Sequence, residues 1–353
     1  MATLTKAHHE LFRREPDECF ETIESLHHHC YEQRDNAAEH WQLPKYLTPT
    51  HREGRLQLDL ENGHQLNLND WSFGQLCKLC GVHRDTINRL RPETAGQAIQ
   101  ETLPITEKPL QILGNGNSMR AIHGVTYTRL WNCELLDVVK EFASDFTAPQ
   151  IAMNGQGTGL YCGEQDMFVF LIDPTGWAEI NGQAFAPGFF VWNSEVGRRS
   201  VGIQTFWFQR ICQNHIVWDA IEVGEFSRKH TANVRDALNE IRRHVETLVA
   251  RRDERRNSFA KVIETAMRAR LGDDAEEVAK ELASRNIPKH LIKDALTIAR
   301  TSGGFTIFSL VDAMTKLSQN VCFAGDRAQL DTRIGQLLAL AAWERIREST
   351  TRM

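Results

Sequence analysis

The stretch NSEVGRRSVGIQTFWFQRICQN, at residues 193–214, combines residue types that contact nucleic acid. Guanidinium groups bind phosphate and aromatic rings stack on bases, so the combination is typical of sites for single-stranded nucleic acid. A central strand, covered on both faces and holding a buried arginine with hydrogen bonds, is the structural alternative. Under the first interpretation, the DNA contacts come from Arg198, Arg199, Arg210, Trp207 and Phe208.

Residues 226–270 form the only basic part of the chain, with 12 Lys and Arg against 6 Asp and Glu. The whole chain carries a net charge of −5. Long-range attraction of a polyanion therefore has to come from this part or from local clusters. Apolar residues at helical spacing, interrupted at arginines, predict a long helix here. Its expected DNA-attracting residues are Arg242, Arg243, Arg251, Arg252, Arg255 and Arg256.

The segment CKLCGVH supplies Cys77, Cys80 and His83, which make half of a structural zinc site. No second pair stands at a familiar spacing, which favours two cysteines buried on one face of a helix. We therefore expect neither a bound metal nor another cofactor.

The same part of the chain, FGQLCKLCGVHRDTINRL, also has the pattern of a helix-turn-helix. Gly81 stands at the turn, and Arg84, Thr86 and Asn88 fall on the second, recognition helix. Such patterns arise by chance in many helical proteins, so ordinary helix packing is the competing interpretation.

Catalytic motifs are sparse. Glu195 and His215 are capable of acid–base chemistry, but no set of partner residues accompanies them. The glycine runs GNGNS and NGQGTG lack the spacing of phosphate-binding loops, so we interpret them as turns. The sequence leaves an enzymatic activity uncertain and favours its absence.

The composition is that of a globular protein with 353 residues and 41% hydrophobic residues. No apolar run approaches the roughly 18 residues that span a membrane, and the polar start of the chain differs from a secretory signal. The eight cysteines are scattered, which is typical of reduced thiols. We expect a cytoplasmic protein without a membrane partner.

The element pattern predicts an α+β fold with a central antiparallel meander sheet flanked by helices and a helical C-terminal third. A hairpin is expected around Asn62-Gly63, and turn residues divide residues 150–218 into strands. We divide the chain into an N-terminal helical region with a small hairpin, a central α+β sheet domain, and a helical region that begins with the long basic helix. The boundaries are 1–110, 111–225 and 226–353.

Three segments carry a family resemblance: SMRAIHGVTYTRLWNCELLDVV, PGFFVWNSEVGRRSVGIQTFWFQRICQN and GDRAQLDTRIGQLLALAA. They resemble the phage/plasmid-like proteins catalogued as a domain of unknown function, over about residues 70–340. Members usually have glycine after the RICQN segment, where this chain has His215. The order of helix, meander and long helix is also similar to the phage single-strand annealing proteins Red-beta, RecT and Erf. That similarity implies oligomers that hold DNA along a basic groove.

We therefore expect a protein of phage or plasmid origin that binds single-stranded DNA as a homo-oligomer, with strand annealing as an extension of that activity. One alternative is a non-catalytic interaction or structural oligomer of a mobile element. A second alternative is a helix-turn-helix regulator that binds DNA. The first hypothesis requires no cofactor or nucleotide.

Overall fold

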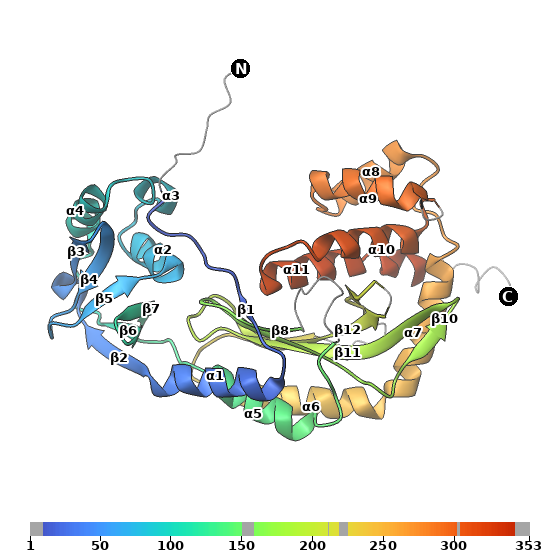
Figure 1. Ribbon diagram of the computed structural model, residues 1–353, viewed down its shortest axis with the longest axis horizontal. Coiled ribbons are helices and arrows are strands. Elements are labelled where there is room, and N and C mark those ends of the chain that lie inside the picture. The colour runs from blue at the N-terminus through green and yellow to red at the C-terminus, as the bar shows by residue number, and fades with distance from the viewer. Residues whose placement is uncertain (1–9, 150–158, 211, 219–224, 302–303, 343–353) are drawn as a thin grey trace, which may run out of the picture.

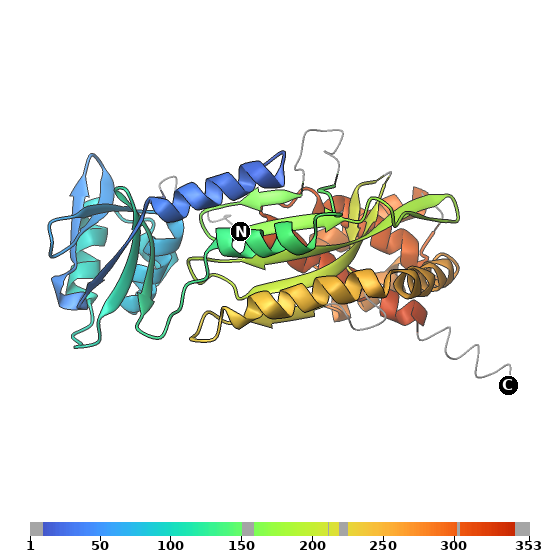
Figure 2. The same cartoon turned by 90° about the horizontal axis from the view of Figure 1, so that it is seen from below.

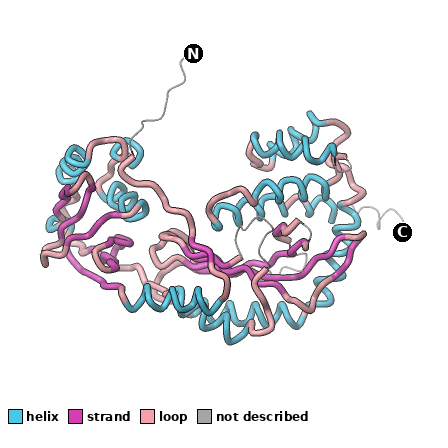
Figure 3. Tube along the Cα trace, in the orientation of Figure 1, coloured by secondary structure: helices cyan, strands magenta, loops and turns pink. Residues whose placement is uncertain are grey.

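The computed structural model describes residues 10–149, 159–210, 212–218, 225–301 and 304–342. In this part of the chain the fold is α+β, as predicted, with two sheets in two lobes that lie side by side (Figure 1). The strands gather into two separate groups, one in each lobe (Figure 3). We call them the first and the second sheet.

The first sheet has the strand order β2-β6-β7-β5-β4-β3, and its neighbours are antiparallel except for the parallel pair of β5 and β7. The expected hairpin is β4–β5, where Gly63 has φ +81° in the connecting turn. The strands are β2 (Ala37–Gln42), β3 (Thr48–Arg52), β4 (Arg55–Asp59), β5 (Gln65–Leu68), β6 (Leu110–Asn115) and β7 (Ser118–Gly124).

Helices cover one face of the first sheet, because the alternating apolar residues of β4 and β5 point toward them. Leu56, Leu58 and Leu66 are buried there against Phe73 and Leu76. The helices are α2 (Asp70–Leu79), α3 (Arg84–Ile87) and α4 (Pro92–Thr102). The sequence boundary at residue 110 cuts through this sheet, because β6 and β7 pair with strands from the first 70 residues.

The second sheet is antiparallel, with the order β1-β8-β9-β11-β12-β13, and the meander predicted for this region is its centre. β10 also pairs with β11, and β14 pairs with β12. The strands are β1 (Glu18–Cys19), β8 (Leu160–Cys162), β9 (Met167–Ile172), β10 (Ala178–Ile180), β11 (Gln183–Asn193), β12 (Val201–Gln209), β13 (Asn214–Ile216) and β14 (Glu225–Arg228).

Both faces of the second sheet are covered, so its central strands are apolar at successive positions. On the helix face, Val169, Val191 and Ile203 pack against α1 (Ile23–Asp35), α5 (Asn132–Phe142) and α6 (Asp236–Ala250). These three helices lie across the strands in Figure 2, where α1 is blue, α5 green and α6 gold. On the opposite, groove face, Phe190 and Phe206 pack against α11 (Ala324–Gly335).

The predicted long basic helix is two helices. α6 ends at Ala250 and α7 (Arg252–Ala266) begins after Arg251, whose φ of −103° and ψ of 19° break the helical path. α7 continues onto the end of the sheet, where Phe259 packs on Trp207. The C-terminal third is helical as predicted, and besides α11 it contains α8 (Ala275–Ser284), α9 (Lys289–Thr301) and α10 (Ile307–Ser318). No helix of the described residues has the length and apolar character of a membrane span.

Candidate nucleic-acid interface

The turn between β11 and β12, residues 193–197, is almost completely buried. The Glu195 carboxylate is 2% exposed, forms an ion pair with Arg120 at 2.9 Å, and accepts the backbone N–H of Asn132 at 2.8 Å. The Asn193 amide donates to the Leu130 carbonyl at 2.8 Å. Because a buried carboxylate needs such partners, this turn is fixed in position.

One side chain of the first lobe and two from the segment between β7 and α5 bind the backbone of the same turn. The indole N–H of Trp71, on α2, donates to the Val196 carbonyl at 2.8 Å, and the Tyr127 hydroxyl donates to the Glu195 carbonyl at 2.9 Å. Arg129 also donates to the Glu195 carbonyl. Gly197 has φ +74°, and a Cβ atom there would lie 2.8 Å from the His123 ring. The turn at residues 193–197 therefore contacts both lobes, and its last position requires glycine.

Aromatic rings surround this junction. His123 stacks on Tyr127 with ring centroids 3.6 Å apart, and His230 lies over the same tyrosine at 5.4 Å. Burial, together with the nearby Arg129 charge, lowers the pKa of His123 to about 3. Burial also lowers the pKa of His230, to about 4. Both imidazoles are therefore neutral at physiological pH, and the stack adds no positive charge to the interface.

The turn delivers two consecutive arginines to different environments. Arg199 is 12% exposed and forms ion pairs with Asp166 at 2.6 Å and with Asp326 at 3.3 Å. Arg198 is exposed, and its guanidinium lies 5.7 Å from the Trp71 ring centroid. Arg198 makes no ion pair with any described residue. Of these two arginines, Arg198 therefore has the charge that is available to a ligand.

A segment before β1, residues 10–17, crosses between the lobes, and we call it the strap. It begins on the first lobe, where the backbone of Phe12 and the Asn88 side chain bond to each other in both directions. It ends on the second lobe, where Arg14 pairs with Asp166 at 3.1 Å and Asp17 accepts the backbone N–H of Ala324 at 2.9 Å. Burial raises the pKa of the Asp17 carboxyl.

Three neighbouring hollows extend from the second lobe across the junction to the strap and the first lobe, and we call them together the interlobe groove. The first, of about 510 Å³, lies between β11, β12 and α11, and Arg198 lines both it and the second, of about 840 Å³. The second is bounded by α2, β7 and the buried turn. It shares the ion-paired Asp70 and Arg84 with the third hollow, of about 560 Å³, beside the strap.

The aromatic residues predicted to stack on bases are inside the protein. Trp207 is 1% exposed and stacks on Phe259 of α7 at 4.1 Å, and Phe208 is 4% exposed on the other side of the sheet. Burial on both faces agrees with the structural alternative for this strand. Arg210, at its end, is exposed and lies 5.6 Å from the Trp177 ring centroid, away from the residues that line the groove.

The predicted arginines of the basic helix lie on α6, α7 and the break between them, not along the groove. Most are held by acidic neighbours: Arg242 by Glu141, Arg243 by Glu240, Arg251 by Glu254, Arg252 by Asp173 and Arg256 by Asp253. Arg255 is buried. The structure does not bring these residues together with Arg198 and Arg199, because the second sheet separates α6 from the groove face.

The cysteines of the CKLC segment lie in the core of the first lobe, where Cys77 packs with Phe73 and Leu76. No group of three or more His, Cys, Asp or Glu side chains with metal-site geometry occurs among the described residues. The expected recognition helix is α3, a single turn in which Arg84 is paired with Asp70 and Asn88 is buried against the strap. These contacts occupy two of the three side chains that a helix-turn-helix would present to DNA.

A comparison with protein families finds a match over about half of the chain. A family model described as "Domain of unknown function (DUF932)" matches residues 127–302. This part of the chain belongs to the DUF932 family. The DUF932 segment contains the buried turn and the second sheet from β8 to β14, and it is narrower than the expected 70–340. No curated protein and no solved structure matches the chain.

Sequence reasoning missed Trp192 and Arg333, which both line the first hollow. Trp192 stands immediately before the predicted stretch, and its strand partner is Gly202, so an aromatic residue opposite glycine was a usable signal. Arg333 lies on α11, more than 100 residues away, and no local pattern connects it with the sheet.

Proposed function

We propose that the interlobe groove binds single-stranded DNA and that Arg198 is its central phosphate contact. The observation that carries this proposal is the position of Arg198, an exposed cation at the junction of the two hollows, without an ion pair among the described residues. A free guanidinium with aromatic neighbours is the kind of group that single-strand binding proteins use.

Other exposed cations support the same path along the groove. The first hollow has Arg333, the second has Lys78 and the third has Arg13, and none of them makes an ion pair with the described part of the chain. The acidic Asp70 of the groove is neutralised by Arg84. A backbone with regularly spaced phosphates therefore meets a cation in each hollow, which favours a polyanion over a small neutral ligand.

A single strand suits the groove better than a duplex. Duplex readers insert a helix or a two-stranded ribbon into the major groove, and α3 is too short and too heavily bonded for that role. The concave, partly aromatic lining of the first hollow suits unstacked bases. Annealing by a homo-oligomer and an origin in a mobile element remain parts of this proposal. Light scattering with and without DNA tests the oligomer.

The test compares Arg198→Ala with Arg243→Ala by fluorescence anisotropy on labelled oligo-dT over a series of salt concentrations. Both arginines are exposed, but Arg243 lies on α6 and is paired with Glu240 at 3.0 Å. We expect Arg198→Ala to weaken binding by about 5- to 10-fold and to reduce the salt slope by about 1. Arg243→Ala should stay within about twofold of the wild type.

Two results would contradict the proposal. One is a wild-type protein that shows no binding to oligo-dT at low ionic strength, where a complex based on phosphate contacts is strongest. The other is equal weakening by both substitutions, since this would place the DNA on the surface as a whole and not in the groove. A stable oligomer without any DNA binding would instead favour the interaction module.

A further inference from the structure

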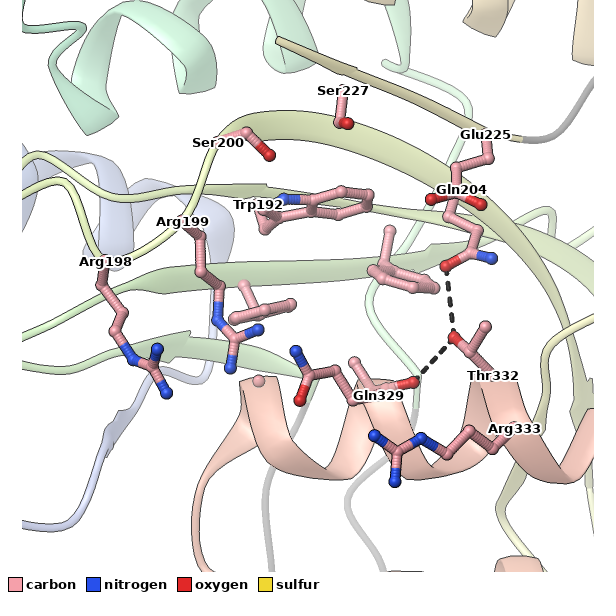
Figure 4. A pocket seen from close by; sticks show the side chains of 14 residues that line it. Trp192, Arg198, Arg199, Ser200, Gln204, Glu225, Ser227, Gln329, Thr332 and Arg333 are labelled. Carbon is pink, nitrogen blue, oxygen red and sulfur yellow. Dashed lines mark hydrogen bonds between the residues drawn. The ribbon is translucent and has the colours of Figure 1, made fainter. Parts of the chain in front are cut away.

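The first hollow is the part of the groove whose lining is most strongly aromatic, and we call it the aromatic pocket. Its side chains come from β9, β11, β12, β14 and α11 and surround one space (Figure 4). Its volume of about 510 Å³ falls within the range of roughly 300–1,000 Å³ that is usual for small-ligand sites. The size is suitable for one nucleotide unit of a longer strand.

Trp192 forms a flat wall of this pocket. Its ring is tilted against Phe190 at a centroid distance of 5.5 Å and stacked beside Phe168 at 6.3 Å. Its cross-strand partner is Gly202, where a Cβ atom would come within 2.4 Å of the indole. The indole therefore occupies the space of a missing side chain, which fixes its orientation, and it is half-buried. A fixed, partly exposed indole is a stacking surface.

The charges around the aromatic pocket favour an anionic guest over a cationic one. Arg199 is held in place by Asp166 and Asp326, and a Cβ atom on Gly325 of α11 would lie 2.5 Å from its guanidinium. Because those carboxylates already neutralise Arg199, the net positive charge comes from Arg198 and Arg333. One lining carboxylate, Glu225, opposes these two cations.

The polar groups of the pocket are uncharged side chains that both donate and accept hydrogen bonds. The amide of Gln204, on β12, accepts a hydrogen bond from Thr332 of α11 at 3.3 Å. Figure 4 shows Gln329 and Ser200 along the same space. Amides of this kind match the mixed donors and acceptors on the edge of a base.

We propose that the aromatic pocket is a nucleobase subsite, in which one base of the bound strand stacks on Trp192 while Arg198 and Arg333 hold the adjacent phosphates. This inference rests on the proposed function of the groove. It moves the stacking role from the buried Trp207 and Phe208 to a tryptophan that lines the groove.

The experiment measures the affinity of the wild type and of Trp192→Ala for oligo-dT and for an abasic oligomer of the same length. We expect the wild type to prefer oligo-dT and Trp192→Ala to bind it about tenfold more weakly. The affinity for the abasic oligomer should not change. Trp192→Phe should restore most of the lost affinity, because phenylalanine keeps an aromatic face. Trp41→Ala, at an exposed tryptophan on β2, is the matched control and should behave as the wild type.

The two proposals fail in different ways. If the wild type binds both oligomers equally, or if Trp192→Ala weakens both equally, the base subsite is wrong while the DNA groove stands. If neither oligomer binds, the proposed function itself is wrong. Photo-crosslinking of the wild type with oligo-dT that contains 5-iodouracil gives an answer without any substitution. A crosslinked peptide with Trp192 supports the subsite, and crosslinks elsewhere overturn it.

Discussion

The two faces of the second sheet differ in how they use arginine. On the helix face, Arg242 and Arg243 of α6 belong to the most basic part of the sequence, yet each has an acidic partner within 3.3 Å. On the groove face, Arg198 and Arg333 belong to parts without a basic excess, yet neither is paired with a described residue. Local ion pairing, more than the net charge of a sequence segment, therefore decides which cations a ligand meets.

Replacing Glu195 should destabilise the protein most, because its buried hydrogen-bond and ion-pair network lies at the junction of the two lobes. Glu195→Ala leaves the buried Arg120 guanidinium without its carboxylate partner and the backbone N–H of Asn132 without its acceptor. We expect the free energy of unfolding to fall by about 3–5 kcal/mol, because an uncompensated buried charge is strongly destabilising. Urea unfolding followed by circular dichroism measures the change.

The matched control for Glu195 is Glu179→Ala, at an exposed position of the same sheet, where a change within about 0.5 kcal/mol is expected. A loss below about 1 kcal/mol for Glu195→Ala would show that the buried turn does not hold the two lobes together.

Asp331, a buried residue of α11, should have an intermediate effect on the free energy of unfolding, and this effect depends on pH. Burial raises the pKa of its carboxyl to about 7, although Arg327 and the Ser318 hydroxyl lower it. The folded protein therefore keeps the proton up to about pH 7, whereas the unfolded chain releases it near pH 4. The contribution of the Asp331 carboxyl to the free energy of unfolding is therefore fully present below pH 4. It decreases as the pH rises above 4 and is lost once the pH has passed the folded-state pKa of about 7. Between pH 5 and pH 7 the loss is about 2 kcal/mol.

Asp331→Asn should remove this part of the pH dependence, because an amide does not titrate. Thermal unfolding of both proteins from pH 5 to pH 8 gives the difference, in which the opposite contribution of the buried, neutral His215 cancels. Parallel pH profiles for the two proteins would mean that Asp331 is ionised throughout, and this would contradict the raised pKa.

The smallest effect is expected on the helix face. Glu240→Gln breaks an exposed pair with Arg243 and should change the free energy of unfolding by less than about 0.5 kcal/mol. It also leaves Arg243 unpaired, so any gain in affinity for oligo-dT would show that the helix face binds DNA once its charges are released. Anisotropy and urea unfolding on the same variant separate these outcomes.

Local patterns were sufficient to predict much of the fold. The apolar spacing of CELLDVVKEFA became α5, and the alternating leucines with Asn62-Gly63 became the β4–β5 hairpin. The two aromatic faces of β12 indicated a strand covered on both sides, and Trp207 and Phe208 are buried on opposite sides of the sheet. Each of these features depends on residues that are close in sequence.

The features that sequence reasoning missed depend on distant residues. β7 enters the first sheet through a parallel pairing with β5, about 50 residues earlier. Arg198 and Arg199 are chemically identical in the sequence, and only Asp166 and Asp326 make one of them structural. The basic helix is broken by the non-helical backbone conformation of Arg251. The arginines that interrupt the apolar spacing indicated a break in this part of the chain, but they did not predict the direction that α7 takes after it.

The contact between the strap and α11 has a consequence for how the protein assembles during synthesis. Asp17 and the backbone of Ala324 are separated by 307 positions, so the ribosome makes the acceptor long before the donor. At about 5–20 residues per second this interval is on the order of 15–60 s. The strands of both sheets are synthesised within that time. The Asp17 carboxylate and the Arg199 guanidinium gain their partners Ala324 and Asp326 only when α11 has been made. The groove is therefore completed only after α11 has left the ribosome and can pack on the second sheet.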